Sequence, residues 1–194
     1  MGLTLSAGPA IEPITLGEAK LHLRIDHGEE DDLINTLITA ARQYAETYTG
    51  RQFITATWIL TLDTLPAVVL LPRPPAQSPL LSFKYCDTAG VLKTLDATHY
   101  ALDNSIEPAR VKPAYSYTWP IVRTETMEAI EITYKSGYGL TAADVPGEIK
   151  AALKLLVGHW FESREAGSAG VIRSGATVPF SVQSLLWHHK VVEA

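Results

Sequence analysis

The order of helical and strand patterns along the chain is the feature that most constrains its fold. Apolar residues recur at helical spacing within residues 16–24 and 29–48, and again within residues 144–161 and 181–190. Between them, from Ala56 to Tyr138, apolar and polar residues alternate with the period of two that is typical of strands. Helices from the two ends that share one core would leave the middle as an insertion. We therefore expect an α+β fold, mostly a helical bundle of an N-terminal helix pair and C-terminal helices, with an inserted antiparallel β-sheet subdomain.

The same patterns predict where the parts of the chain begin and end. Residues 1–54 would form an N-terminal arm and the helix pair, residues 55–140 the β subdomain, and residues 141–194 the C-terminal helices that complete the bundle. Residues 1–13 contain glycines and prolines with little periodicity, which predicts a loose arm. Thr15 and Glu18 have the spacing of a capping box, and Gly50 is placed to end the second helix.

Composition limits the classes of function that the chain can have. Of its 194 residues 46% are hydrophobic, which is enough for a packed core. The net charge of −5 argues against a general nucleic-acid binder, although DNA could still slide past such a surface. Cys86 is the only cysteine, so an internal disulfide or a thiolate zinc cluster is excluded. Without a signal-peptide pattern or a long apolar run, we expect a soluble protein that is made in the cytoplasm.

Residues that could perform chemistry are few. His159 and Glu162 lie three apart on a predicted helix, but two ligands without a third make a poor metal site. His188 and His189 are adjacent, so on a helix they point about 100° apart. We expect no catalytic residue, no cofactor and no metal. A hydrolase that uses His159 and Glu162 is the enzymatic alternative.

Two other segments have the composition of interaction sites. Tyr115, Tyr117 and Trp119 form an aromatic cluster that could stack on a sugar, although few basic residues accompany it and packing that anchors a loop is favoured. In the last predicted helix Trp187 follows Leu185 and Leu186, a combination that can dock on a partner or pack back on its own bundle. Before that helix lies a loop of flexible composition that includes Gly167, Ser168, Gly170 and Gly175.

Several stretches together resemble the head–tail connector proteins of tailed bacteriophages, which are the adaptor rings of the neck and are common in prophages. The resemblance rests on the order and spacing of Pro13–Asp26, Glu30–Leu33, Ala40–Arg51, Leu71–Pro75, Tyr115–Pro120, Tyr134–Gly139, Val145–Glu165 and Val178–Leu186. It spans nearly the whole chain, although no single motif is diagnostic.

The resemblance implies a structural protein of the virion rather than an enzyme. Such proteins form a homo-oligomeric ring of roughly twelve copies through head-to-tail contacts. The ring docks under the portal, extends the DNA channel without binding DNA specifically, and presents a surface to stopper or tail-completion proteins at the head–tail junction. Gene transfer agents contain similar proteins.

Within that interpretation, we expect Leu185, Leu186 and Trp187 to dock on the portal or on a neighbouring subunit, and the loop with Gly167, Ser168, Gly170 and Gly175 to order on assembly. The alternative function is a β-module that binds a glycan or another virion protein through the aromatic loop.

Overall fold

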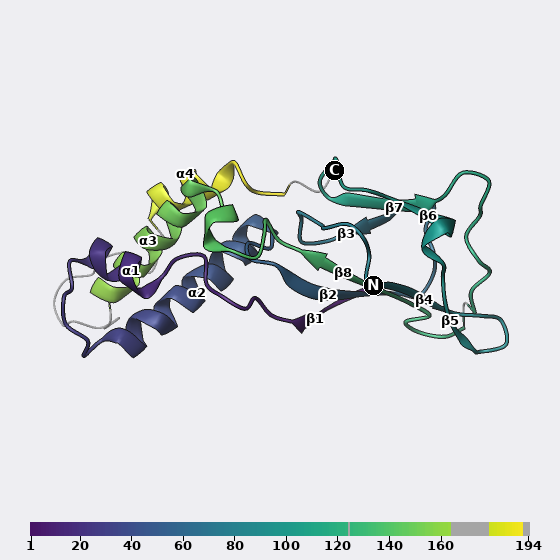
Figure 1. The fold of residues 1–194 in the computed structure, drawn as a ribbon, viewed down its shortest axis with the longest axis horizontal. Coiled ribbons are helices and arrows are strands. Elements are labelled where there is room, and N and C mark those ends of the chain that lie inside the picture. The colour runs from purple at the N-terminus through teal and green to yellow at the C-terminus, as the bar shows by residue number, and fades with distance from the viewer. Residues whose placement is uncertain (124, 164–178, 192–194) are drawn as a thin grey trace. The chain divides into compact units, whose positions relative to one another are not determined.

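The computed structural model describes residues 1–123, 125–163 and 179–191 (Figure 1). Along the chain its strands and α-helices are β1 (Gly2–Ala7), α1 (Leu16–Leu23), α2 (Asp31–Thr49), β2 (Ala56–Leu62), β3 (Val69–Leu71), β4 (Ser82–Cys86), β5 (Leu92–Thr94), β6 (Tyr100–Asp103), β7 (Ala109–Pro113), β8 (Ile130–Ser136), α3 (Gly147–Glu162) and α4 (Phe180–Trp187). Helices from both ends and antiparallel strands between them make an α+β fold, as the sequence predicts.

The chain divides into two compact units, each with its own core. The β unit consists of residues 1–10 and 55–138, and the helical unit consists of residues 11–54 and 139–194. The chain therefore enters the β unit twice, once at its start and once between α2 and α3.

The β unit contains two antiparallel sheets where the sequence suggested one. The first has the strand order β1-β2-β8-β4-β5, and the second has the order β3-β7-β6. Pro72 follows β3 directly, and further prolines at 74, 75 and 79 precede β4. Proline cannot donate a ladder hydrogen bond, so this stretch ends one strand before the chain joins the other sheet.

Alternating side chains of the two sheets build one apolar core. Leu60 of β2, Phe83 of β4 and Ile132 of β8 are fully buried in it, together with Val111 of β7. Tyr134 of β8 is also buried, and its hydroxyl donates a hydrogen bond to the Pro72 carbonyl at 2.6 Å. Burial disfavours the phenolate and raises the pKa of Tyr134.

The first residues differ from the loose arm that the sequence predicts. Gly2–Ala7 form β1, an edge strand in which Leu3 lies opposite Leu60 of β2. Leu3 and Leu5 alternate with Thr4 and Ser6, but a run of this length carries too little periodicity to be distinguished from coil.

The helical unit begins with the capping box that the sequence predicts. The Glu18 N–H donates to the Thr15 hydroxyl at 3.1 Å, and the Thr15 N–H donates to the Glu18 carboxylate at 2.8 Å. Helix α2 ends at Gly50, whose φ of 72° is the left-handed conformation that favours glycine. Thr141 caps a short 3₁₀ helix (Ala142–Asp144), in which the Thr141 N–H donates to the Asp144 carboxylate at 2.9 Å, and α3 starts after Pro146.

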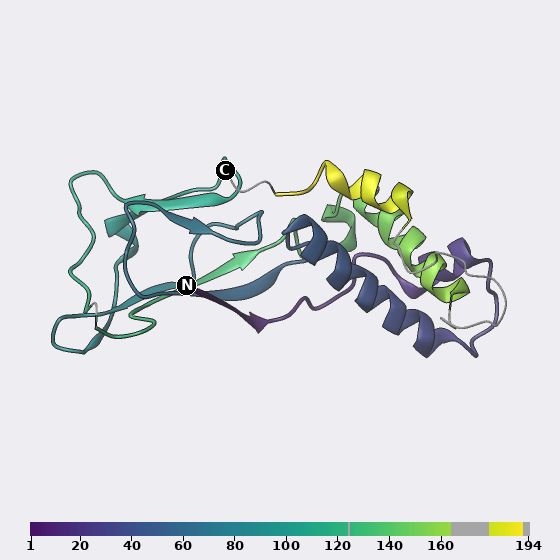
Figure 2. The same cartoon turned by 180° about the vertical axis from the view of Figure 1, so that it is seen from behind.

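Helices α1 to α4 pack around a second core (Figure 2). Its fully buried members include Ile34 and Ala41 of α2, Leu153 and Leu156 of α3, and Val182 and Leu186 of α4. The broad apolar stripe that predicts α2 and α3 is therefore the face that each helix buries.

An ionic network fixes the segment before α1 to α2. The Arg42 guanidinium donates to Glu12 at 2.7 Å and to Glu46 at 3.0 Å, and the second oxygen of Glu46 accepts from Gln52 at 2.7 Å and from the Phe53 N–H at 3.0 Å. Arg42, Glu46 and Gln52 are all buried. Burial opposes the charge on Arg42, but Glu12 and Glu46 outweigh it and raise the pKa of Arg42.

Removing the cation from this network should destabilise the protein strongly. We expect Arg42→Met to lower the free energy of unfolding by about 3 kcal/mol, because the buried Glu46 carboxylate and the half-buried Glu12 carboxylate both lose their cationic partner. Urea denaturation followed by far-UV circular dichroism measures the change. Lys93→Met, which breaks the surface pair with Asp87, is the control and should leave the unfolding midpoint unchanged. If the two substitutions changed the free energy of unfolding equally, the buried network would not be a special source of stability.

The capping box also makes stability depend on pH. The Thr15 N–H and, to a smaller extent, Lys154 hold the pKa of Glu18 below its ordinary value. A lowered folded-state pKa means that the stabilisation is complete above the ordinary pKa of about 4.3 and is lost as pH falls through the folded value. Glu18→Gln should therefore have a lower free energy of unfolding than the original chain at pH 7. The difference between the two free energies should become smaller towards pH 3. Urea titrations at several pH values test this, and a difference that stays constant would contradict it.

Candidate partner-docking site

Helix α4 presents two aromatic side chains on one exposed face. Phe180 is 83% exposed and Trp187 is 62% exposed. The two residues lie seven positions apart, which is close to two full turns and places them on the same side of the helix. On the opposite side Val182 and Leu186 are fully buried in the helical core. Large exposed aromatic residues spaced at i and i+7 are typical of a helix that binds in a groove.

The segment after α4 is held firmly against the end of α2. The Val191 N–H donates to the Thr49 carbonyl at 2.8 Å, and the Arg51 guanidinium donates to the His189 carbonyl. The His189 ring lies 2.9 Å from the Glu148 carboxylate. These contacts anchor the C-terminal side of α4.

The side chain of Lys190, just after α4, lies close to two aromatic rings. The Lys190 ammonium is 5.5 Å from the ring centroid of Trp187 and 5.5 Å from that of Tyr48. Cation–π attraction of this kind orients the Trp187 ring, which still remains largely exposed to solvent. Trp187 is therefore presented in a defined position.

The three residues that the sequence predicts for docking have different environments. Trp187 is exposed, Leu185 is half-buried and Leu186 has no exposed surface. Leu186 cannot contact a partner while α4 stays in place, so its predicted role is corrected to that of a core residue. Sequence reasoning missed Phe180, although its spacing of seven from Trp187 could have identified it.

The predicted assembly loop cannot be placed. Gly167, Ser168, Gly170 and Gly175 lie outside the described residues.

The side chains considered for chemistry do not assemble into a site. In the described ranges no group of three or more His, Cys, Asp or Glu side chains could hold a metal ion. Glu162 is exposed and His159 is half-buried on α3. Glu162 also borders a hollow of about 350 Å³ whose lining includes His22 and Phe161 but not His159. The pair proposed for a hydrolase therefore does not meet in this hollow.

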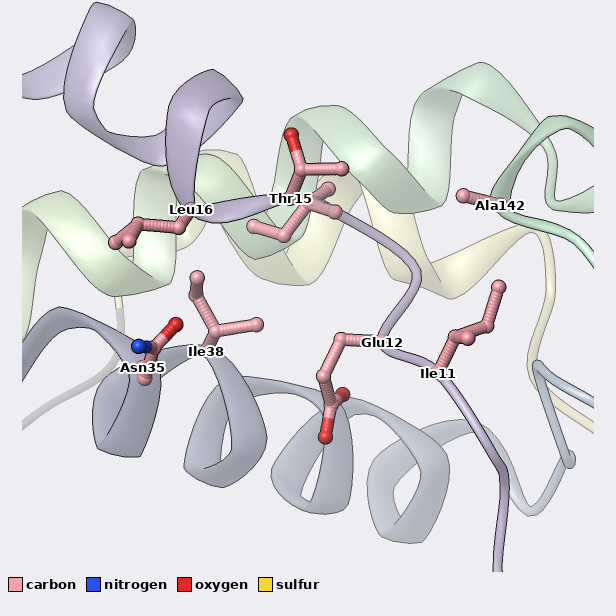
Figure 3. Close-up of a pocket in the computed structure, with 8 residues that line it drawn as sticks. Ile11, Glu12, Thr15, Leu16, Asn35, Ile38 and Ala142 are labelled. Atoms are coloured by element: carbon pink, nitrogen blue, oxygen red, sulfur yellow. The ribbon is translucent and has the colours of Figure 1, made fainter. Parts of the chain in front are cut away.

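A second hollow, of about 280 Å³, lies between the segment before α1 and helix α2 (Figure 3). Its lining is mainly apolar and includes Ile11, Leu16 and Ile38. Two of its three polar members serve the fold, since Glu12 binds Arg42 and Thr15 caps α1. The figure shows the Glu12 carboxylate turned towards α2.

The aromatic loop of the β unit has one ring turned inward and one turned outward. The Trp119 indole donates to the Pro66 carbonyl at 2.9 Å and lies 5.6 Å from the Phe83 ring. Tyr117 stacks on His99 at 4.3 Å, whereas Tyr115 is 97% exposed. Trp119 therefore anchors the loop, and only Tyr115 is fully available for stacking on a ligand.

No helix in the part of the chain that the structure describes is long and apolar enough to cross a membrane.

Part of the chain matches a family of known proteins. Residues 13–85 match the family of phage gp6-like head-tail connector proteins. This match confirms, for that stretch, the resemblance seen in the sequence. No curated protein matches the chain.

Solved structures extend the likeness to the whole fold. A chain in the neck of an empty gene transfer agent particle, computed with C6 symmetry, has a TM-score of 0.81 and 22% sequence identity. A chain in the virion of a native gene transfer agent particle has a TM-score of 0.81 and 23% identity, and one in a native neck computed with C12 symmetry has 0.78 and 21%. Each alignment covers 100% of this chain and 97% of the other. At this level of identity the likeness establishes the fold.

The role of Trp119 as a loop anchor leads to a test of the glycan alternative. Trp119→Ala should lower the free energy of unfolding of the β unit by about 2 kcal/mol, because a half-buried ring and its hydrogen bond are lost. Tyr115→Ala, at the exposed position, is the control and should change it by less than about 0.5 kcal/mol. Urea denaturation measures both. A stable Trp119→Ala variant that has lost binding on a glycan array would instead favour the glycan module.

Proposed function

We propose that this chain, which matches the head-tail connector family over residues 13–85 and shares its fold with neck chains of a gene transfer agent, is a structural connector of the virion neck. The family match carries the proposal, because it covers both predicted N-terminal helices and the first strands of the β insertion. The protein acts as a non-enzymatic building block at the head–tail junction of a phage or gene transfer agent.

In this role the chain forms a homo-oligomeric ring of roughly twelve copies, in which each copy makes head-to-tail contacts with the next. Similar folds occur in necks that were computed with C6 and C12 symmetry, which supports a ring. The ring docks under the portal, extends the channel for DNA, and offers its other side to stopper or tail-completion proteins.

The charge distribution suits a channel that DNA passes through without being held. The helical unit contains 13 acidic and 9 basic residues, and the β unit contains 8 acidic and 7 basic residues. Neither unit has the excess of Lys and Arg that phosphate binding requires. A net negative surface repels DNA at long range and favours passage over retention.

Docking on the portal or on a neighbouring subunit is assigned to the exposed face of α4. Phe180 and Trp187 are its aromatic anchors, and Leu185 is half-buried. Aromatic residues with large exposed surfaces are the side chains that most often dominate binding energy at interfaces.

The alternative, a β-module that binds a glycan or another virion protein, is favoured by one observation. Tyr115 is almost completely exposed at the tip of the aromatic loop. A glycan array or pull-down signal that is lost with Tyr115→Ala and kept with Trp187→Ala would support it.

Native mass spectrometry with a portal ring from the same genome tests the proposed function. About a dozen copies of the original chain should bind to one portal ring. Trp187→Ala or Phe180→Ala should weaken this binding roughly 30-fold, the equivalent of an interface hot spot of about 2 kcal/mol.

The matched control is Leu21→Ala, which removes an exposed apolar side chain from α1 of the same unit. It should bind like the original chain. A chain that ignores the portal at every concentration would overturn the connector role, and normal binding by both aromatic variants would overturn the assignment to α4.

A further inference from the structure

Strand β1 leaves one side of the five-stranded sheet open. It pairs with β2 on one side, and it is the last strand in the order β1-β2-β8-β4-β5. In Figure 2 it lies at the margin of the sheet beside β2. In an antiparallel ladder alternate residues direct their N–H and C=O groups away from the partner strand. The outer groups of β1 can therefore pair with a further strand.

The other three sheet edges carry the features that normally block such pairing. Strands β5 and β3 have three residues each, β5 contains Lys93, and β3 runs directly into Pro72. Strand β6 ends in the charged residue Asp103. Short length, charge and proline are the usual protections of an edge strand.

Strand β1 has none of these three protections, and a β-bulge, which also protects edge strands, occurs only near its end, between Leu5 and Ala7. It has six residues, without a charged side chain or a proline, and its pairing is regular from Gly2 to Leu5 before a bulge. Leu3 packs against the core, whereas Leu5, on the same face and opposite Trp58, is 46% exposed. A strand added beside β1 would cover the Leu5 side chain.

Charge indicates which partner fits this edge. Residues 1–10 contain no Asp, Glu, Lys or Arg, in a chain whose net charge is −5. Copies of an acidic chain repel each other, so they approach most easily through a neutral surface. An uncharged edge strand on an acidic protein is therefore suited to contact with a second copy of the same chain.

We propose that β1 is a subunit interface, at which an extended strand of a second copy pairs with its open edge and continues the sheet from one subunit to the next. The proposal rests on the ring form of the proposed function and names a surface that builds it. In a ring the contact is head-to-tail, whereas pairing of β1 with β1 would need a two-fold axis and would stop at a dimer. The strand that the neighbour contributes is therefore a different one.

A single lysine on the exposed edge tests the interface. Leu5→Lys and Thr4→Lys place a charge at exposed positions of β1 and should reduce the assembled fraction at least tenfold, because edge lysines prevent strand pairing. Native mass spectrometry of the purified chain over rising concentration, alone and on the portal ring, measures assembly. Far-UV circular dichroism and the urea midpoint of the monomer establish that each variant is folded.

The matched control is Leu81→Lys. Leu81 is 51% exposed and precedes β4, which lies inside the sheet. This variant should assemble like the original chain. Folded Leu5→Lys and Thr4→Lys variants that form complete rings would overturn the interface while leaving the connector function in place. An original chain that stays monomeric even with the portal would overturn both.

Hydrogen exchange gives an independent readout without a substitution. The amides of Gly2–Ala7 that face away from β2 should exchange at least tenfold more slowly in the assembled ring than in the monomer. Assembly that leaves their exchange rates unchanged would overturn the proposal.

Discussion

The pairing of β2 with β8 is the constraint on which the rest of the structure depends. These strands run antiparallel in unbroken register from Ala56 opposite Ser136 to Leu62 opposite Ile130. Just outside the ladder, Ile54 forms a bridge with Gly139. More than eighty residues separate the point where the chain leaves the helical unit from the point where it returns. The ladder and the bridge hold these two points together. Because the insertion closes on itself, α2 and α3 can share one core as if they were joined by a short turn.

The helical unit then depends on a polar network inside an apolar core. Glu46 accepts hydrogen bonds from Arg42, Gln52 and the Phe53 backbone, so α2 and the chain that follows it have one defined arrangement. Burying such a network costs free energy unless every member is paired. Its main effect is therefore to fix one arrangement of the chain, more than to add stability. A defined arrangement of the helical unit is consistent with the proposed docking through α4.

Much of the fold was predictable from local patterns. The Thr15–Glu18 capping box, the length of α2, its end at Gly50 and the turn between β4 and β5 at residues 87–90 all follow from short-range rules. The errors occur where a pattern is short. Six residues of β1 carry too weak a period to be distinguished from an arm, and the division of the strands between two sheets depends on which strands pair.

The candidate site was predictable only in part, because exposure depends on packing between helices. Leu185, Leu186 and Trp187 are adjacent, and their sequence does not reveal which of them faces the core. The tertiary structure buries Leu186 against the other helices, exposes Trp187, and adds Phe180 to the same face.

The sequence by itself therefore determined the helices, the strand-rich stretch between them and the family that the chain resembles, since helix periodicity, caps and turns are local properties. Only the tertiary structure decided which aromatic residues reach the surface and which sheet edges remain open. These features arise from contacts between residues far apart in the chain, and no local pattern encodes them.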